Sequence, residues 1–314
     1  MMMLASPGLY AGIGPDRYHG QLTVTPSLSA SMAVTIIDEC PAKMFANCYL
    51  DPEYEGEQRQ DFDIGTAAHL GLLEPDLWAE RIVEIDADSY RTKDAKAARD
   101  AAYAAGRTPL LTDQADRVRA MGAAARRNAE ICRVMTGARF ETTLVWQDRE
   151  TGVWLKTRPD VLALTGGELH DYKTTTCAEE STFERRAADL LYFQKAAWYL
   201  DGVEAVTGAR PEVYGFIVQE TKRPFLTAVY DLDERAIEWG RKMNRVAIDL
   251  FAECLATGIW PGYGGRRGCI GLPAYTDIRL GQRDEAGEFR RRPPIKAKPN
   301  RAQLSASDRW QAPL

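Results

Sequence analysis

Apolar residues recur with helical spacing through much of the first half of the chain. The segments that carry this period are residues 27–49, 64–77, 93–106 and 113–136. Ser27 and Ser29 are good N-cap candidates for the first helix, and Pro41 interrupts or restarts it. Thr112 precedes the last helix as a natural N-cap, and Gly137 follows it where a C-cap belongs. The first half of the chain is therefore predicted to be mainly helical.

The pattern then changes to runs of β-formers bounded by turn residues. The predicted strands are residues 140–147, 153–164, 168–174, 212–219 and 225–230. Short turns separate the first three, which predicts an antiparallel meander. A long helix over residues 181–202 divides the strands into three and two, and Asp233 begins a last helix that runs to about residue 257. This order predicts an α/β fold with one central mixed sheet flanked by helices.

The two ends of the chain differ from the middle. Residues 1–26 are rich in Gly, Pro and Thr and are predicted to form an irregular arm. Residues 281–314 are basic, rich in Pro and poor in apolar residues, which predicts a disordered tail. Residues 27–280 are then expected to form a single domain, with a helical part over 27–137 and a core over 138–260.

Composition narrows the class of protein. Hydrophobic residues make up 45% of the 314-residue chain, enough for a substantial core, and the net charge is −5. An acidic protein can still bind DNA through a local basic groove. No apolar run is long enough to span a bilayer and no secretory signal is evident, so we expect a soluble cytoplasmic protein. The six cysteines form no CxxC pair, which argues against a zinc ribbon or an iron–sulfur cluster.

The candidate chemistry begins with the sequence Asp171-Tyr172-Lys173. In a strand, residues i and i+2 point to the same face, so Asp171 and Lys173 are predicted to be neighbours. A carboxylate can hold a divalent cation, and the ammonium beside it can steer a water and neutralise developing charge. A lone motif of this kind is more often a pair of charges on the surface of a strand.

A second carboxylate strengthens the functional interpretation. Asp160 lies eleven residues upstream, across a short turn that can bring it alongside Asp171. Two carboxylates at that separation repel each other unless a cation lies between them. Pro159 is unfavourable inside a central strand, so it predicts a break in strand pairing where Asp160 is presented.

These residues resemble the motif of the PD-(D/E)XK nuclease superfamily, which has a restriction-endonuclease-like core. Three further segments are similar to motifs of its RecB-like branch, most closely the RecE-type, exodeoxyribonuclease VIII-like group of phage and prophage exonucleases. They are residues 65–75 (GTAAHLGLLEP), residues 194–199 (QKAAWY) and the closing residues 260–263 (WPGY), and the Ser-rich helix that ends at Pro41 fits as well. The resemblance covers roughly residues 25–280, with the motifs in the expected order.

The resemblance implies a role for each matching residue. Asp160 and Asp171 would bind the metal, with His69 and the Tyr172 carbonyl completing its ligands. Lys173 would position the attacking water, and Gln194 and Tyr199 would contact the DNA end or the scissile phosphate. The implied cofactor is Mg²⁺, and a site that includes an imidazole should accept Mn²⁺ readily.

Some positions depart from the motif or stay open. Gln194 and Tyr199 are five residues apart, so they diverge by roughly 140° on an ideal helix and should flank the substrate. Glu141 is either a further ligand or a solvated carboxylate, and we favour the solvated form. The candidate DNA-contacting residues are Arg158, Lys195, Arg185, Arg186 and Lys156.

The predicted function is a metal-dependent exodeoxyribonuclease that hydrolyses linear double-stranded DNA from its ends. The resemblance implies 5′→3′ degradation that leaves 3′ single strands, a ring-shaped homo-oligomer and a single-strand annealing protein as partner. Two alternatives remain: another PD-(D/E)XK nuclease such as an endonuclease, or a non-catalytic DNA-binding or assembly subunit. The intact set of Asp160, Asp171 and Lys173 argues against a non-catalytic subunit.

Overall fold

A computed structural model describes residues 3–54, 60–163, 167–264 and 267–290. The chain divides into two units, residues 1–264 and residues 265–314. In the second unit, α12 (Ala274–Glu285) is a helix. It includes residues 281–285, the first five residues of the predicted disordered tail. The first residues of the predicted tail therefore lie in a helix, and residues 291–314 lie outside the described residues. No helix in the described ranges is long and apolar enough to cross a membrane.

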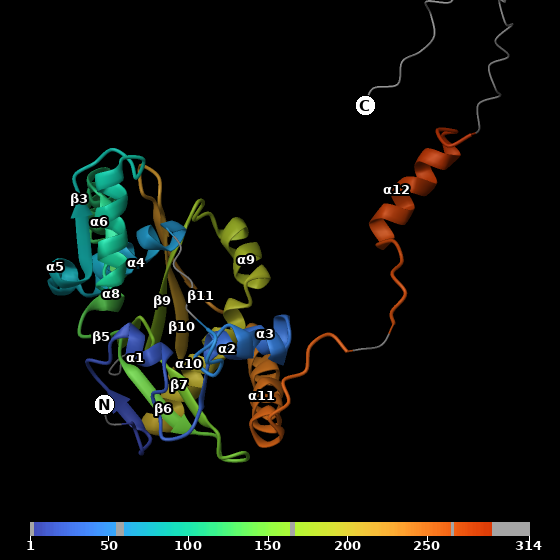
Figure 1. The fold of residues 1–314 in the computed structure, drawn as a ribbon, viewed down its shortest axis with the longest axis horizontal. Coiled ribbons are helices and arrows are strands. Elements are labelled where there is room, and N and C mark those ends of the chain that lie inside the picture. The colour runs from blue at the N-terminus through green and yellow to red at the C-terminus, as the bar shows by residue number, and fades with distance from the viewer. Residues whose placement is uncertain (1–2, 55–59, 164–166, 265–266, 291–314) are drawn as a thin grey trace, which may run out of the picture. The chain divides into compact units, whose positions relative to one another are not determined.

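A five-stranded mixed sheet forms the centre of the first unit (Figure 1). Its order is β11 (Thr227–Asp231), β10 (Val213–Glu220), β9 (Glu168–Thr175), β8 (Val161–Ala163) and β5 (Arg139–Phe140). β9 and β10 are parallel, and the other neighbours are antiparallel. The α/β fold with a central mixed sheet is thus confirmed.

The predicted single sheet is in fact divided. A second, four-stranded sheet has the order β1 (Gly8–Tyr10), β6 (Thr143–Gln147), β7 (Trp154–Thr157) and β2 (Ser27–Ser29). The first two predicted strands each break and continue in the other sheet. One break lies at Glu141, which has a φ of 47°, and the other lies around Pro159, where the sequence predicted a loss of pairing.

Helices cover both faces of the five-stranded sheet. One face packs its Tyr172 and Ile217 against α4 (Gln60–Leu73), α7 (Thr112–Ala125) and α8 (Ala129–Met135). The other face packs against α9 (Glu180–Asp189) and α10 (Tyr192–Thr207). α2 (Ala30–Asp38) and α11 (Glu234–Thr257) join α10 over the four-stranded sheet. Side chains alternate along β9, so Asp171 and Lys173 share the face of α9 and α10.

A third, two-stranded sheet was not predicted. β3 (Ile82–Ile85) pairs in parallel with β4 (Thr108–Leu111), and α6 (Lys93–Ala104) connects them. The remaining short elements are α1 (Pro15–His19), α3 (Pro41–Ala46), the 3-10 helix η1 (Pro75–Leu77) and α5 (Trp78–Arg81).

The N-terminal arm is ordered where the sequence predicted irregular chain. β1 extends the four-stranded sheet, and α1 follows it. Ile13, Tyr18 and Leu22 are buried against Val145 and Trp154, so apolar packing fixes the arm to the outer face of that sheet.

Local signals in the sequence determined several helix boundaries. The Ser29 hydroxyl caps α2 by accepting from Met32 N, and Pro41 opens α3 at its first turn, as predicted. The Asp233 carboxylate caps α11 by accepting from Ala236 N. Thr112 is the first residue of α7 and not its N-cap: its hydroxyl donates to the Ile85 carbonyl, and Leu111 precedes the helix with its N–H donating to Gln114 Oε1.

The predicted helix over residues 181–202 is two helices. Leu191 lies between α9 and α10 with a φ of 51°, which ends one helix and begins the other.

Candidate active site

Asp160 and Asp171 lie next to each other on one face of the central sheet. Val161 pairs with His170 in the antiparallel register of β8 and β9. The same register, extended by one residue, places Asp160 opposite Asp171. Both residues are nearly buried, at 8% and 4% relative exposure. The backbone N–H of Tyr172 donates to Asp160 Oδ2 over 2.8 Å, which fixes that carboxylate at the open end of β8.

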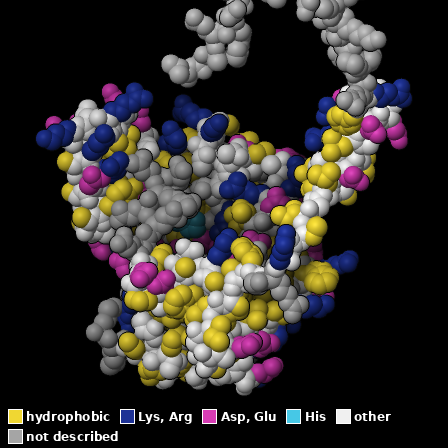
Figure 2. Space-filling view, turned by 45° about the vertical axis from the view of Figure 1, so that its right-hand side comes forward, with side chains coloured by type: hydrophobic (Ala, Val, Ile, Leu, Met, Phe, Trp, Pro, Cys, Tyr) yellow, Lys and Arg dark blue, Asp and Glu magenta, His cyan; other side chains and the backbone are white. Residues whose placement is uncertain are grey.

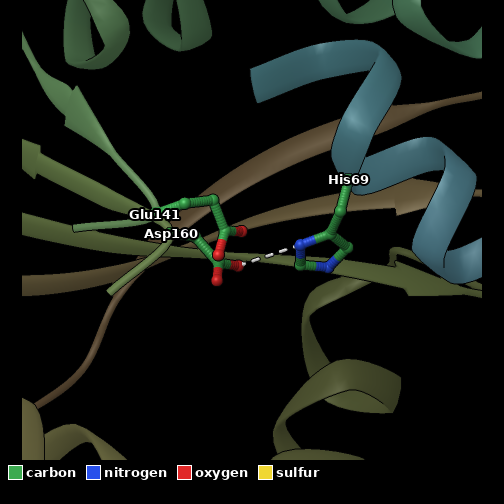
Figure 3. Close-up of side chains that lie close together, drawn as sticks. All are labelled: His69, Glu141 and Asp160. Carbon is green, nitrogen blue, oxygen red and sulfur yellow. Dashed lines mark ion pairs between the residues drawn. The ribbon is translucent and has the colours of Figure 1, made fainter. Parts of the chain in front are cut away.

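His69 and Glu141 approach Asp160 from two other elements (Figure 3). His69 lies on α4, and its Nδ1 is 3.3 Å from Asp160 Oδ2. Glu141 lies at the break between β5 and β6, where its N–H donates to the Asp160 carbonyl over 3.3 Å. Ligand atoms of His69, Glu141 and Asp160 all lie within 4.8 Å of one another. We expected Glu141 to be solvated, and the structure corrects this by placing it in the cluster.

The electrostatics of the cluster favour a cation. Burial, and next the Asp171 carboxylate, raise the pKa of Asp160. Burial and the Asp160 carboxylate raise the pKa of Glu141 to about 8. Like charges held together out of water destabilise each other until a proton or a metal ion neutralises them. Carboxylate oxygens and one imidazole are suitable donors for Mg²⁺ or Mn²⁺, so the residues present fit a divalent ion.

Lys173 forms an ion pair with Asp171. Burial opposes the charge of Lys173, but the carboxylates of Asp171 and Asp160 outweigh burial and raise the pKa of its ammonium. Lys173 is therefore a cation near neutral pH. It can donate hydrogen bonds and neutralise negative charge, but it holds no lone pair with which to act as a base.

The helix α10 carries two residues that the sequence suggested for the site, Lys195 and Tyr199. Lys195 and Tyr199 are four residues apart and share a helix face. The pKa of Lys195 is lowered by burial and by the nearby Lys173, and that of Tyr199 is raised by burial and by Asp171, so both side chains lie near the acids. The ammonium groups of Lys173 and Lys195 lie 5.3 and 5.8 Å from the centre of the Tyr192 ring.

Gln194 lies on the same helix, α10. Its side chain is fully buried, and neither amide atom has a hydrogen-bond partner among the described residues. An unpaired amide in a buried site costs free energy.

The structure separates the other predicted DNA contacts. Arg158 forms an ion pair with Glu141, at 2.8 Å from its Nε to Glu141 Oε2. Arg185 and Arg186 are exposed on α9. Lys156 was expected to line a DNA groove. It is instead buried and donates to the carbonyl of Tyr18, so it cannot contact DNA there. Figure 2 shows a hollow on one face of the molecule, with a histidine inside it and Lys and Arg side chains near its rim.

Comparison with known proteins agrees with this fold. One solved structure that is similar to this chain is described as "Putative exonuclease" from Eubacterium rectale. It has 13% sequence identity and a TM-score of 0.58, and the match covers 87% of this chain and 100% of the other, which shows a common fold. No curated protein matches the sequence. A family model, the PDDEXK-like domain of unknown function (DUF3799), matches residues 29–272. The chain therefore belongs to this PDDEXK-like family.

Proposed function

We propose that this chain is a metal-dependent exodeoxyribonuclease that hydrolyses linear double-stranded DNA. The observation that carries the proposal is the cluster of His69, Glu141 and Asp160 beside the Asp171–Lys173 pair. It combines oxygen-rich metal donors with a fixed ammonium, which is what hydrolysis of a phosphodiester requires. The family and the fold support the same class of reaction.

His69, Glu141, Asp160 and Asp171 would hold the ion. A bound Mg²⁺ or Mn²⁺ lowers the pKa of water and offsets negative charge on a phosphate. The protein groups supply the rest. Lys173 hydrogen-bonds the attacking water and neutralises charge that develops on the phosphate.

The residues on α10 would hold the substrate. The Tyr199 phenol stays protonated, because burial and Asp171 raise its pKa, so it can donate to a phosphate oxygen. Lys195 would neutralise a neighbouring phosphate, and the unpaired amide of Gln194 would accept or donate once water or substrate reaches it. Arg185 and Arg186 on α9 would contact the DNA backbone farther from the cut.

The finer parts of the proposal rest on the resemblance to RecE-type exonucleases. They are 5′→3′ polarity, 3′ single-stranded products used for recombination by annealing, a ring-shaped homo-oligomer, and a single-strand annealing protein as partner.

The test compares linear and circular duplex DNA incubated with Mg²⁺, Mn²⁺ or EDTA. We expect the linear DNA alone to be degraded, with either metal but not with EDTA. Nicked circles would contradict the exonuclease and favour an endonuclease, and bound but uncut DNA would favour a non-catalytic subunit. Duplexes labelled at the 5′ or the 3′ end then show polarity, since 5′→3′ degradation releases the 5′ label first.

A further inference from the structure

The N-terminal arm reaches the candidate active site, although it lies outside the matched family region of residues 29–272. Arg158 makes the connection. On one side its Nε is 2.8 Å from Glu141 Oε2. On the other, its Nη1 lies 3.3 Å from the Ile13 carbonyl, to which it donates, and its guanidinium lies 5.1 Å from the centre of the Tyr18 ring. One side chain thus contacts both the arm and a member of the acidic cluster.

Independent contacts fix the arm at this point. Lys156 donates to the carbonyls of Tyr18 and Gly20 over 2.6 and 3.1 Å. The Tyr18 ring is buried, at 8% exposure, and the β1–β6 pairing holds the preceding part of the arm. The groups that contact Arg158 are therefore part of the folded first unit.

Glu141 needs such support for two reasons. Its backbone has a φ of 47°, in the left-handed region that is unfavourable for a residue with a side chain. Its carboxylate also lies beside that of Asp160, which repels it when both are charged. The guanidinium of Arg158 is planar and is itself held by the arm. It can therefore orient the Glu141 carboxylate and stabilise its negative charge better than a flexible lysine would.

We propose that the N-terminal arm completes the metal site, with Arg158 as a positioning residue that keeps Glu141 in the cluster and with Ile13 and Tyr18 holding Arg158. This inference rests on the proposed function, in that the cluster binds a divalent ion. It assigns Arg158 to the arrangement of the metal ligands, whereas the sequence suggested that it contacts phosphate.

The test measures Mn²⁺ affinity directly, by calorimetry on the full chain without DNA. Removing a group that orients a metal ligand weakens binding by roughly 10- to 100-fold. We therefore expect Arg158→Met to weaken Mn²⁺ binding by about 10-fold or more. Arg158→Lys should weaken it less, and Tyr18→Leu should weaken it as well. Tyr18→Phe keeps the ring and should bind Mn²⁺ like the wild type.

Leu22→Ala is the matched control for the arm. Leu22 is buried, at 1% exposure against 8% for Tyr18, and packs in the same apolar cluster with Val145 and Trp154. We expect it to lower the melting temperature while leaving the Mn²⁺ affinity unchanged. Equal losses of affinity in Leu22→Ala and Tyr18→Leu would overturn the inference, because the arm would then act only through overall stability. Wild-type affinity in Arg158→Met would overturn it as well.

The same measurement separates this inference from the proposed function. If the wild type binds Mn²⁺ and Arg158→Met does not, the positioning role of Arg158 is supported. This holds even if neither protein cuts DNA. If the wild type binds no Mn²⁺, the positioning role and the proposed metal site both fall.

Discussion

The backbone N–H of Tyr172 donates a hydrogen bond to the carboxylate of Asp160, over 2.8 Å. In a strand, the N–H and the C=O of one residue point to the same edge. The Tyr172 carbonyl therefore points toward the edge at which Asp160 lies, beyond the last paired residue of β8. This is the position that a backbone ligand of the metal would need, as the resemblance implied.

Lys173→Ala should abolish DNA cleavage and leave DNA binding largely intact. The ammonium of Lys173 pairs with Asp171 and is held charged, so its loss removes a fixed positive charge from the reacting phosphate. Removal of one such group commonly lowers kcat by about 10²–10³-fold. Single-turnover cleavage and a DNA-binding titration check this. Lys195→Ala is the control, for which we expect a higher KM and a weaker salt dependence of binding. Retained cleavage in Lys173→Ala would remove Lys173 from the mechanism.

Gln194→Leu should stabilise the protein while lowering its activity. The buried amide of Gln194 has no hydrogen-bond partner among the described residues, and an unsatisfied buried group costs about 1–3 kcal/mol. Replacing it by an apolar residue of similar size should raise the melting temperature by a few degrees. Thermal melts and cleavage rates check both effects. A variant with unchanged cleavage would show that Gln194 has no part in the reaction.

The metal-free protein should lose stability as the pH rises from about 5 to about 8. Burial and Asp160 raise the pKa of Glu141 from its ordinary 4.5 to about 8 in the folded state. The folded protein then holds a proton that the unfolded chain has released, so the free energy of unfolding falls with pH in this window. Each pKa unit corresponds to about 1.4 kcal/mol.

Added Mn²⁺ should reverse this trend, because it binds the deprotonated carboxylates and stabilises the folded state more at pH 8 than at pH 5. Melting temperatures with and without Mn²⁺ across this range are the measurement. The control, Glu141→Gln, should flatten both curves. A metal-free melting temperature that rises between pH 5 and pH 8 in the wild type but not in Glu141→Gln would contradict the assignment.

Gly240→Ala should destabilise the contact between α10 and α11. A Cβ at Gly240 would clash with the Phe193 carbonyl oxygen and lie 3.0 Å from Gln194 Cα, so the helices must separate. Such overpacking typically costs about 1–3 kcal/mol. Cleavage should fall as well, because α10 carries Lys195 and Tyr199. Gly264→Ala is the control, since nothing lies within 4 Å of its added Cβ. Equal melting temperatures for the two variants would show that this close contact is not needed.

Local sequence signals predicted much of the fold. Caps such as Ser29 and Asp233 act within one helical turn, so the residues themselves determine where those helices begin. Asp171 and Lys173 share a face because strand geometry has a period of two. The break at Pro159 also follows from local chemistry, since proline cannot donate to a ladder.

Features that depend on distant residues could not be predicted in this way. Nothing near Glu141 in the sequence indicates a positive φ, which brings it to Asp160 and splits the predicted strand between two sheets. The sequence around Lys156 is typical of a lysine on the surface. Its ammonium can be buried only because two carbonyls of the folded arm accept its hydrogen bonds. The four-residue strands β3 and β4 are stable only because they pair with each other over 22 intervening residues.

The most direct test of the central claim is the rate at which Asp160→Asn degrades linear duplex DNA in the presence of Mn²⁺. Asp160 contacts His69, Glu141 and the Tyr172 N–H, so its carboxylate is the centre of the proposed metal site. Asparagine keeps the shape but removes the charge that binds the ion. The account predicts cleavage at least ~100-fold slower than the wild type, with an unchanged melting temperature or a higher one in the absence of metal. Cleavage at the wild-type rate would contradict it.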